Sequence, residues 1–91
     1  MKIYYSKHAE EKFTEESYVF KLRITKRLIK KIIEKPDAED ESRGEKLTVI
    51  SGIDKLHSLI VVYRLIPTGI FIITFFPARK GRYESKILQR R

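Results

Sequence analysis

The residues of this chain that are best suited to chemistry are cationic and aromatic, and they gather in its second half. Arg79, Arg82 and Tyr83 follow the last apolar run, and Arg64 is the one charged residue inside the preceding run. Guanidinium groups bind phosphate and stabilise charge that develops on phosphorus, while a phenol or an imidazole can transfer a proton. Such a set could bind a phosphodiester and, in RNA, assist attack by the substrate's own 2′-OH without a metal.

Each of these residues also has a purely structural interpretation. Arg64 could form a salt bridge to the helices, because an unpaired charge in an apolar strand is costly. Arg79 and Arg82 could belong to a solvated basic tail. His8 could transfer protons or be a surface or capping residue, and we interpret His57 as structural. We interpret four tyrosines as packing residues: Tyr4, Tyr5, Tyr18 and Tyr63.

Positive charge is concentrated in two blocks of the chain. Residues 21–35 carry a net charge of +6 and residues 79–91 one of +5, whereas residues 36–46 carry −3. The 91-residue chain has a formal net charge of +8. Clustered cations favour a polyanion partner, because phosphate contacts supply affinity through counterion release. The alternatives are a solvated basic helix face or an acidic protein partner. We expect nucleic acid to contact Lys26, Arg27, Lys30, Lys31, Lys80 and Arg82.

The first third of the chain favours a strand followed by helix. Residues 2–5 are rich in Ile and Tyr, which is typical of a strand, and Ser6 is typical of a helix N-cap. We expect this helix to end near residue 19 or 20, although Thr14 could instead cap a second short helix.

A clearer helix is predicted over residues 26–35. Thr25 is its expected N-cap, and Pro36 ends it because the residue before a proline disfavours the helical region. The acidic, turn-forming residues 37–44 then predict a loop. One face of the helix is apolar and carries Leu28, Ile29, Ile32 and Ile33.

Three strands are expected next, over residues 46–53, 57–66 and 70–76, with Pro77 ending the last. Their links are too short for crossover helices, so the strands should form an antiparallel meander. We therefore expect one α+β domain over residues 1–91, with an N-terminal strand and two helices packed on this meander. A dimer interface or the C-terminal tail would cover the other face of the sheet.

The hairpin expected between residues 57–66 and 70–76 decides whether Arg64 and Arg79 can meet. A turn at residues 67–69 places Arg64 near Ile72, so Arg79 lies seven residues beyond that pair. The two arginines then converge only if the chain bends back at Pro77.

Several classes of protein are excluded by composition. The chain has no Cys and two His, which excludes disulfides, thiolate-bound metals and multi-His sites, so we expect no metal and no cofactor. The N-terminus lacks a signal peptide's apolar stretch, and Arg64 and Pro67 interrupt the most apolar segment, so we expect a cytoplasmic protein without a membrane span. The amide content of the chain is low: it has no Asn, and Gln89 is its single Gln. This composition is typical of hyperthermophile proteins.

Longer motifs resemble a known group of proteins. The first half carries SKHAEEKF at residues 6–13 and a helix opened by IT at 24–25 and closed by PD at 36–37. The second half carries HSLIVVYR at residues 57–64 and ARKGRYE at 78–84. These motifs resemble RelE/ParE-like toxins, including BrnT-like toxins, and a small domain family grouped with them. The BrnT-like N-terminal motif is missing.

The resemblance implies a RelE-like fold and a metal-independent RNA endonuclease of a toxin–antitoxin system, which cleaves messenger RNA on the ribosome. It implies that Arg64 and Arg79 bind phosphate and that Tyr83 is the acid or base, and His8 matches a helix-start histidine of the small domain family. RNA or the ribosome would be the substrate and an acidic antitoxin the partner. Several relatives do not cleave RNA, so a non-catalytic nucleic-acid-binding or protein-interaction domain of the same fold is the alternative.

Overall fold

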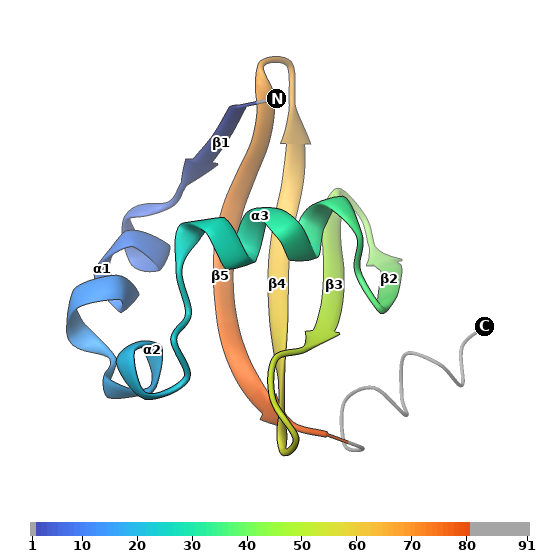
Figure 1. The fold of residues 1–91 in the computed structure, drawn as a ribbon. Helices are drawn as coiled ribbons and strands as arrows, with labels where there is room; N and C mark the ends of the chain where they lie inside the picture. The colour runs from blue at the N-terminus through green and yellow to red at the C-terminus, as the bar shows by residue number, and fades with distance from the viewer. Residues whose placement is uncertain (1, 81–91) are drawn as a thin grey trace.

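One mixed sheet with helices against one of its faces makes up the part of the chain that the structure describes (Figure 1). The structure is a computed structural model that describes residues 2–80, and for residues 41–43 it describes the backbone alone. The elements in this range are β1 (Lys2–Tyr5), α1 (Lys7–Glu15), α2 (Ser17–Lys21), α3 (Lys26–Glu34), β2 (Ala38–Arg43), β3 (Lys46–Gly52), β4 (His57–Ile66) and β5 (Gly69–Arg79).

The strands lie in the order β1-β5-β4-β3-β2. The pairs β2–β3, β3–β4 and β4–β5 are antiparallel, whereas β1 is parallel to β5. The α+β class and the antiparallel meander of β3, β4 and β5 are therefore confirmed. The sheet is mixed, because the N-terminal strand joins its edge in parallel to β5.

The N-terminal segment forms a strand and then two helices where one was expected. Ser6 caps α1 by accepting a hydrogen bond from the Ala9 amide at 3.0 Å, as predicted. Glu16 has extended backbone angles and separates α1 from α2. It also occupies the N-cap position of α2, so Thr14 does not cap the second helix. The described chain thus has three helices.

The third helix follows the sequence prediction closely. The Thr25 hydroxyl accepts a hydrogen bond from the Leu28 amide at 3.1 Å, which satisfies one of the free N–H groups of the first turn. Ile29, Ile32 and Ile33 are buried against the sheet. The basic residues of α3 consequently face outward.

The acidic segment after Pro36 is strand β2, so the predicted loop is wrong. Asp37 fixes its start: the Asp37 amide donates to the Ile50 carbonyl, and the Asp37 carboxylate accepts from the Gly52 amide at 2.9 Å. Ala38 is then buried beside Ile50. The low strand propensity of Asp and Glu predicts a loop here. Charged residues nevertheless suit an edge strand, because they discourage pairing with other chains.

Strand β5 continues through Pro77 to Arg79, so the predicted end at this proline is also wrong. Pro77 pairs with Leu59 of β4. Strand β1 covers the other side of β5 only as far as Ile72. Pro77 therefore lies where β5 is an edge strand, and edge positions tolerate a residue that has no N–H.

The main core lies between the helices and the sheet, with Ile29, Leu59, Ile72 and Phe75 fully buried. A smaller apolar cluster lies on the opposite face, consisting of Ala38, Ile50 and Ile60 with Val62 and Ala78 packed against it. The tail expected to cover this face, from residue 81 onward, lies outside the described residues. None of the helices within residues 2–80 is long and apolar enough to cross a membrane.

Candidate nucleic-acid interface

The β4–β5 hairpin separates the two candidate arginines. Arg64 pairs with Phe71, one residue from the expected partner, and Arg79 pairs with His57 at the other end of the hairpin. Arg79 lies eight positions beyond Phe71 on β5, which corresponds to roughly 25 Å of extended chain. The strand runs on through Pro77, so Arg64 and Arg79 are not brought together. Tyr83 and Arg82 lie outside the described residues.

Arg64 lies on the face of the sheet opposite the helices. Its neighbour Tyr63 belongs to the core on the helix side, so the Arg64 side chain points away from that core. The expected alternative of a salt bridge to the helices is therefore wrong. The guanidinium carbon instead lies 5.1 Å from the centroid of the Phe71 ring, and this cation–π contact stabilises an exposed charge.

Three of the other predicted residues lie apart from one another. His8 is exposed near the start of α1, and its side chain has no hydrogen bond or ion pair within residues 2–80. Lys31 is exposed on α3. The end of the Lys80 side chain lies against Gly52, where an added Cβ would come within 2.9 Å of Lys80 Cε.

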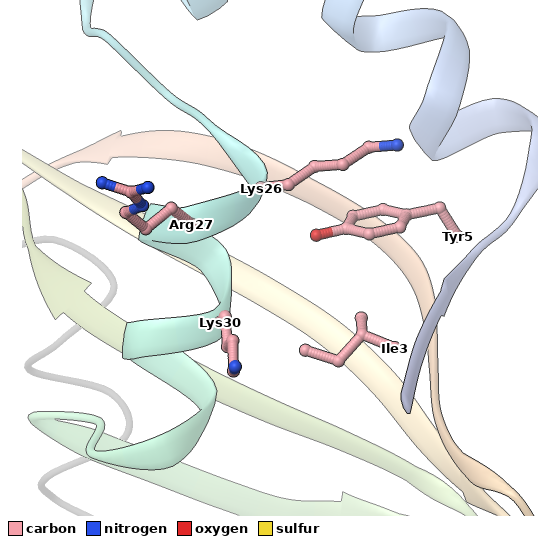
Figure 2. A pocket seen from close by; sticks show the side chains of 5 residues that line it. All are labelled: Ile3, Tyr5, Lys26, Arg27 and Lys30. Atoms are coloured by element: carbon pink, nitrogen blue, oxygen red, sulfur yellow. The ribbon is translucent and has the colours of Figure 1, made fainter. Parts of the chain in front are cut away.

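A shallow groove of about 410 Å³ lies between β1 and α3, and we call it the β1–α3 groove (Figure 2). Alternation in β1 turns Ile3 and Tyr5 toward the helix layer. Lys26, Arg27 and Lys30 line the groove from α3, where residues three or four apart share a face. The groove therefore combines three cationic side chains with an aromatic hydroxyl.

Lys26 is held in place by neighbours on two sides. Its ammonium group lies 2.8 Å from a carboxylate oxygen of Glu10 and 4.9 Å from the centroid of the Tyr5 ring. Tyr5 in turn packs edge-to-face on Phe13, with the ring centroids 5.7 Å apart. This contact network links α1, β1 and α3, so Lys26 has a structural role in the groove and is partly neutralised by Glu10.

The Tyr5 hydroxyl points from β1 toward α3 in Figure 2. Burial, together with the nearby Glu10 carboxylate, raises its pKa from 10.0 to about 12. A tyrosine hydroxyl is protonated near neutral pH, and this one can donate a hydrogen bond to an anion in the groove. We interpreted Tyr5 as a packing residue from sequence. One sequence signal could have identified Tyr5 as a groove residue. Side chains alternate between the two faces of a strand, so Tyr5 lies on the same face as Ile3, toward the helices.

Arg27 and Lys30 are the free cations of the β1–α3 groove. Both are exposed, and neither forms an ion pair with any described residue. With the Tyr5 hydroxyl they offer a guanidinium fork, an ammonium and a neutral donor to one ligand. This combination suits a phosphate group, for which arginine and lysine supply charge and tyrosine a directed hydrogen bond.

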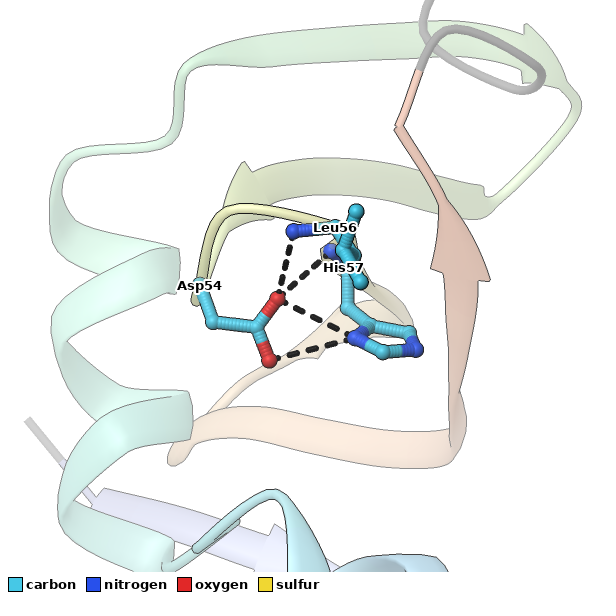
Figure 3. A network of polar contacts seen from close by, with 3 residues as sticks. All are labelled: Asp54, Leu56 and His57. Carbon is cyan, nitrogen blue, oxygen red and sulfur yellow. Dashed lines mark hydrogen bonds and ion pairs between the residues drawn. The ribbon is translucent and has the colours of Figure 1, made fainter.

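A second polar arrangement closes the β3–β4 hairpin (Figure 3). Asp54 accepts hydrogen bonds from the Leu56 and His57 amides at 2.8 and 2.7 Å, and His57 Nδ1 lies 3.0 Å from the same carboxylate oxygen. The hydrogen bond from the Leu56 amide lowers the pKa of Asp54 most; desolvation opposes it, and the amide and imidazole of His57 add smaller lowering effects. Asp54 thus stays ionised and orients the imidazole.

His57 is also the residue that lies beside Arg79. The two are cross-strand partners on β4 and β5, so their side chains leave the same face with Cβ atoms about 5 Å apart. An imidazole oriented by a carboxylate and placed next to a guanidinium could move a proton beside a bound phosphate. We interpreted His57 as structural, and the register of the hairpin was needed to place it next to Arg79.

Comparisons of this chain with protein-family models, with curated proteins and with solved structures find no match. The resemblance to RelE/ParE-like toxins therefore depends on the motifs quoted above.

Proposed function

We propose that this domain binds RNA through the β1–α3 groove. The observation that carries the proposal is that Tyr5, Arg27 and Lys30 line one open groove, with both cations unpaired among the described residues. The net charge of +8 adds long-range attraction for a polyanion. RNA is favoured over other polyanions by the resemblance to RelE/ParE-like toxins.

Salt-dependent binding of a fluorescent single-stranded RNA tests this proposal. Each phosphate contact that is removed should reduce the slope of log affinity against log salt by about 1. The double variant Arg27→Gln, Lys30→Gln should therefore lose about two units of slope. Tyr5→Phe should weaken binding by about 3–10-fold and leave the slope unchanged, because it removes a neutral hydrogen bond.

The matched control is the double variant Lys46→Gln, Lys55→Gln, which removes two exposed cations from outside the groove. If the RNA binds with the same slope to the groove variant and to the wild type, or if both double variants lose slope equally, the groove is not the binding site.

Metal-independent RNA cleavage is a second candidate function, and the position of His57 beside Arg79 favours it. In this reaction His57 Nε2 accepts the proton of the 2′-OH, the 2′-oxygen–phosphorus bond forms and the bond to the 5′-oxygen breaks. Arg79 stabilises the charge on phosphorus, and Tyr83 is the candidate donor of a proton to the departing 5′-oxygen. The products are a 2′,3′-cyclic phosphate and a 5′-hydroxyl.

Incubation of RNA with the protein in EDTA, with and without ribosomes, tests this second function. His57→Gln and Arg79→Gln should each lower the cleavage rate at least 100-fold. Each of the two histidines serves as the control for the other: His8→Gln should retain cleavage if His57 is the base. If the RNA stays intact in the presence of ribosomes, the protein does not cleave RNA. This result would not contradict the proposal that the protein binds RNA.

A further inference from the structure

Lys26 lines the β1–α3 groove, but its charge is neutralised by a residue from outside the groove. The Lys26 ammonium group lies 2.8 Å from one carboxylate oxygen of Glu10 and 3.1 Å from the other. Glu10 belongs to the first turn of α1 and is not among the residues that line the groove. Of the three cations that line it, Arg27 and Lys30 are therefore available to an anion, whereas Lys26 is already paired.

The Lys26–Glu10 ion pair is open to water and can be exchanged. The two side chains are 54% and 50% exposed. Water and salt screen the attraction between such groups, so an ion pair of this kind contributes little to stability. A phosphate that enters the groove can consequently replace the carboxylate at Lys26 at a small cost in free energy.

The ammonium group of Lys26 has further contacts that do not depend on Glu10. It lies 4.9 Å from the centroid of the Tyr5 ring and 5.6 Å from that of the Phe13 ring. Figure 2 shows the Lys26 side chain above the Tyr5 ring. Because the face of an aromatic ring attracts a cation, these rings hold Lys26 beside the groove when the carboxylate is displaced.

Glu10 also keeps a favourable position without Lys26. It is an acidic residue in the first turn of α1, where negative charge interacts favourably with the helix dipole. Its amide donates to the Ser6 carbonyl at 2.9 Å, so α1 itself holds the Glu10 backbone in place. Breaking the ion pair therefore leaves both partners in stabilising surroundings.

The start of α3 favours an anion beside Lys26. Lys26 and Arg27 are the first two residues of this helix, and its first turn contains no acidic residue. The positive end of a helix dipole attracts an anion and disfavours a lysine. Glu10 supplies the negative charge in the free protein, and a phosphate of the RNA backbone could supply it in the complex.

We propose that Glu10 competes with RNA for Lys26 and thereby limits the affinity of the β1–α3 groove. This inference rests on the proposed binding of RNA in that groove. A phosphate gains Lys26 only by displacing Glu10, so one ion pair replaces another and Lys26 adds little net affinity in the wild type. Without the Glu10 carboxylate, Lys26 becomes a third phosphate contact beside Arg27 and Lys30.

Glu10→Gln tests the competition, because it removes the carboxylate and keeps the length of the side chain. The fluorescent single-stranded RNA should bind about 3–5-fold more tightly, and the slope of log affinity against log salt should increase by about 1. Glu11→Gln is the matched control. It makes the same change in net charge at the next position of α1, where the exposed side chain has no ion pair with any described residue. It should change the affinity less than about 2-fold.

A double-mutant cycle with Lys26→Met separates competition from general repulsion of the RNA by Glu10. Methionine keeps most of the aliphatic side chain but has no charge. Lys26→Met alone should change the affinity less than about 2-fold, whereas in the Glu10→Gln background it should weaken binding about 3–5-fold. The gain from Glu10→Gln should therefore be absent when residue 26 is uncharged.

Two results would overturn this inference alone, provided that the wild type binds RNA. One is an equal effect of Glu10→Gln and Glu11→Gln. The other is a gain from Glu10→Gln that persists with Lys26→Met, because Glu10 would then act by repulsion only. Failure of both the wild type and Glu10→Gln to bind RNA would overturn the proposed function together with this inference.

Discussion

The ammonium group of Lys12 donates a hydrogen bond to the main-chain carbonyl of Phe75 at 2.5 Å. This carbonyl belongs to the part of β5 that has no strand on its outer side, because β1 ends opposite Ile72. Ser6 bonds the carbonyls of Ile72 and Ile73 just before it, through its amide and its hydroxyl. Helix α1 and its cap therefore close the edge of the sheet where β1 stops.

Replacing Lys12 should weaken this closed edge. Lys12→Met keeps most of the aliphatic side chain but leaves the Phe75 carbonyl without its donor, and we expect a loss of about 1–2 kcal/mol in the free energy of unfolding. Urea denaturation measures the loss. Lys7→Met is the control, since Lys7 is exposed on the same helix and its side chain forms no hydrogen bond or ion pair within residues 2–80. Equal stability of both variants would mean that the Lys12 bond does not hold the edge.

Two glycines with positive φ should respond differently to alanine. A Cβ on Gly69 would lie 2.1 Å from the Lys2 carbonyl oxygen, whereas a Cβ on Gly44 meets no atom within 4 Å. Gly44→Ala should cost about 1 kcal/mol, from its φ of +59° alone. Gly69→Ala should cost at least about 2–3 kcal/mol and release β1. Hydrogen exchange of the Ser6 amide, which donates to the Ile72 carbonyl of β5, checks the release, and equal protection in the two variants would contradict it.

The raised pKa of Tyr5 predicts a loss of stability in alkali. The unfolded chain releases the Tyr5 proton at about pH 10, and the folded chain at about pH 12. The contribution of Tyr5 is therefore complete below pH 10 and is lost as the pH rises from about 10 to about 12. Over this window the wild type should lose about 1–2 kcal/mol more than Tyr5→Phe, after discounting for partial exposure.

Tyr4→Phe is the control for the alkaline loss, because Tyr4 is 39% exposed on the other face of β1. Urea denaturation of the three proteins at several pH values gives the comparison. If Tyr5→Phe and the wild type lose stability in parallel between pH 10 and pH 12, the Tyr5 hydroxyl is not buried as described.

Relief of the backbone strain at Arg23 should stabilise the domain. Arg23→Gly removes the unfavourable left-handed conformation and should raise the free energy of unfolding by about 0.5–1 kcal/mol. Arg23→Ala keeps the strain and removes the charge, so its stability should stay within about 0.5 kcal/mol of the wild type. Thermal denaturation of the two variants separates these effects. A lower melting temperature for Arg23→Gly would show that the arginine side chain stabilises the fold.

Local signals were sufficient to predict much of the fold. Ser6 and Thr25 were recognisable as helix caps, because a hydroxyl before an apolar-periodic segment satisfies free N–H groups. Strand β4 was predicted with its observed bounds, His57–Ile66, from an apolar run between two turns. These features depend on residues close together in sequence.

Features that depend on distant residues were not predictable in this way. Strand β2 forms because Asp37 and Ala38 find partners on β3, and β5 passes Pro77 because no strand pairs with that side. The basic residues of α3 were predictable from helical spacing. The roles of Tyr5 and His57 depend on which residues lie across from them, and the register of the sheet alone decides that.

The parallel pairing of β1 with β5 also sets the order in which the molecule can assemble. Contacts such as that between Ser6 and Ile73 join residues 67 apart, so a growing chain must complete the β4–β5 hairpin before its first strand has a place to dock. Until then Ile3 and Tyr5 stay in water, and one wall of the β1–α3 groove does not exist. Newly made protein would therefore complete the groove that we propose binds RNA at the last step of folding.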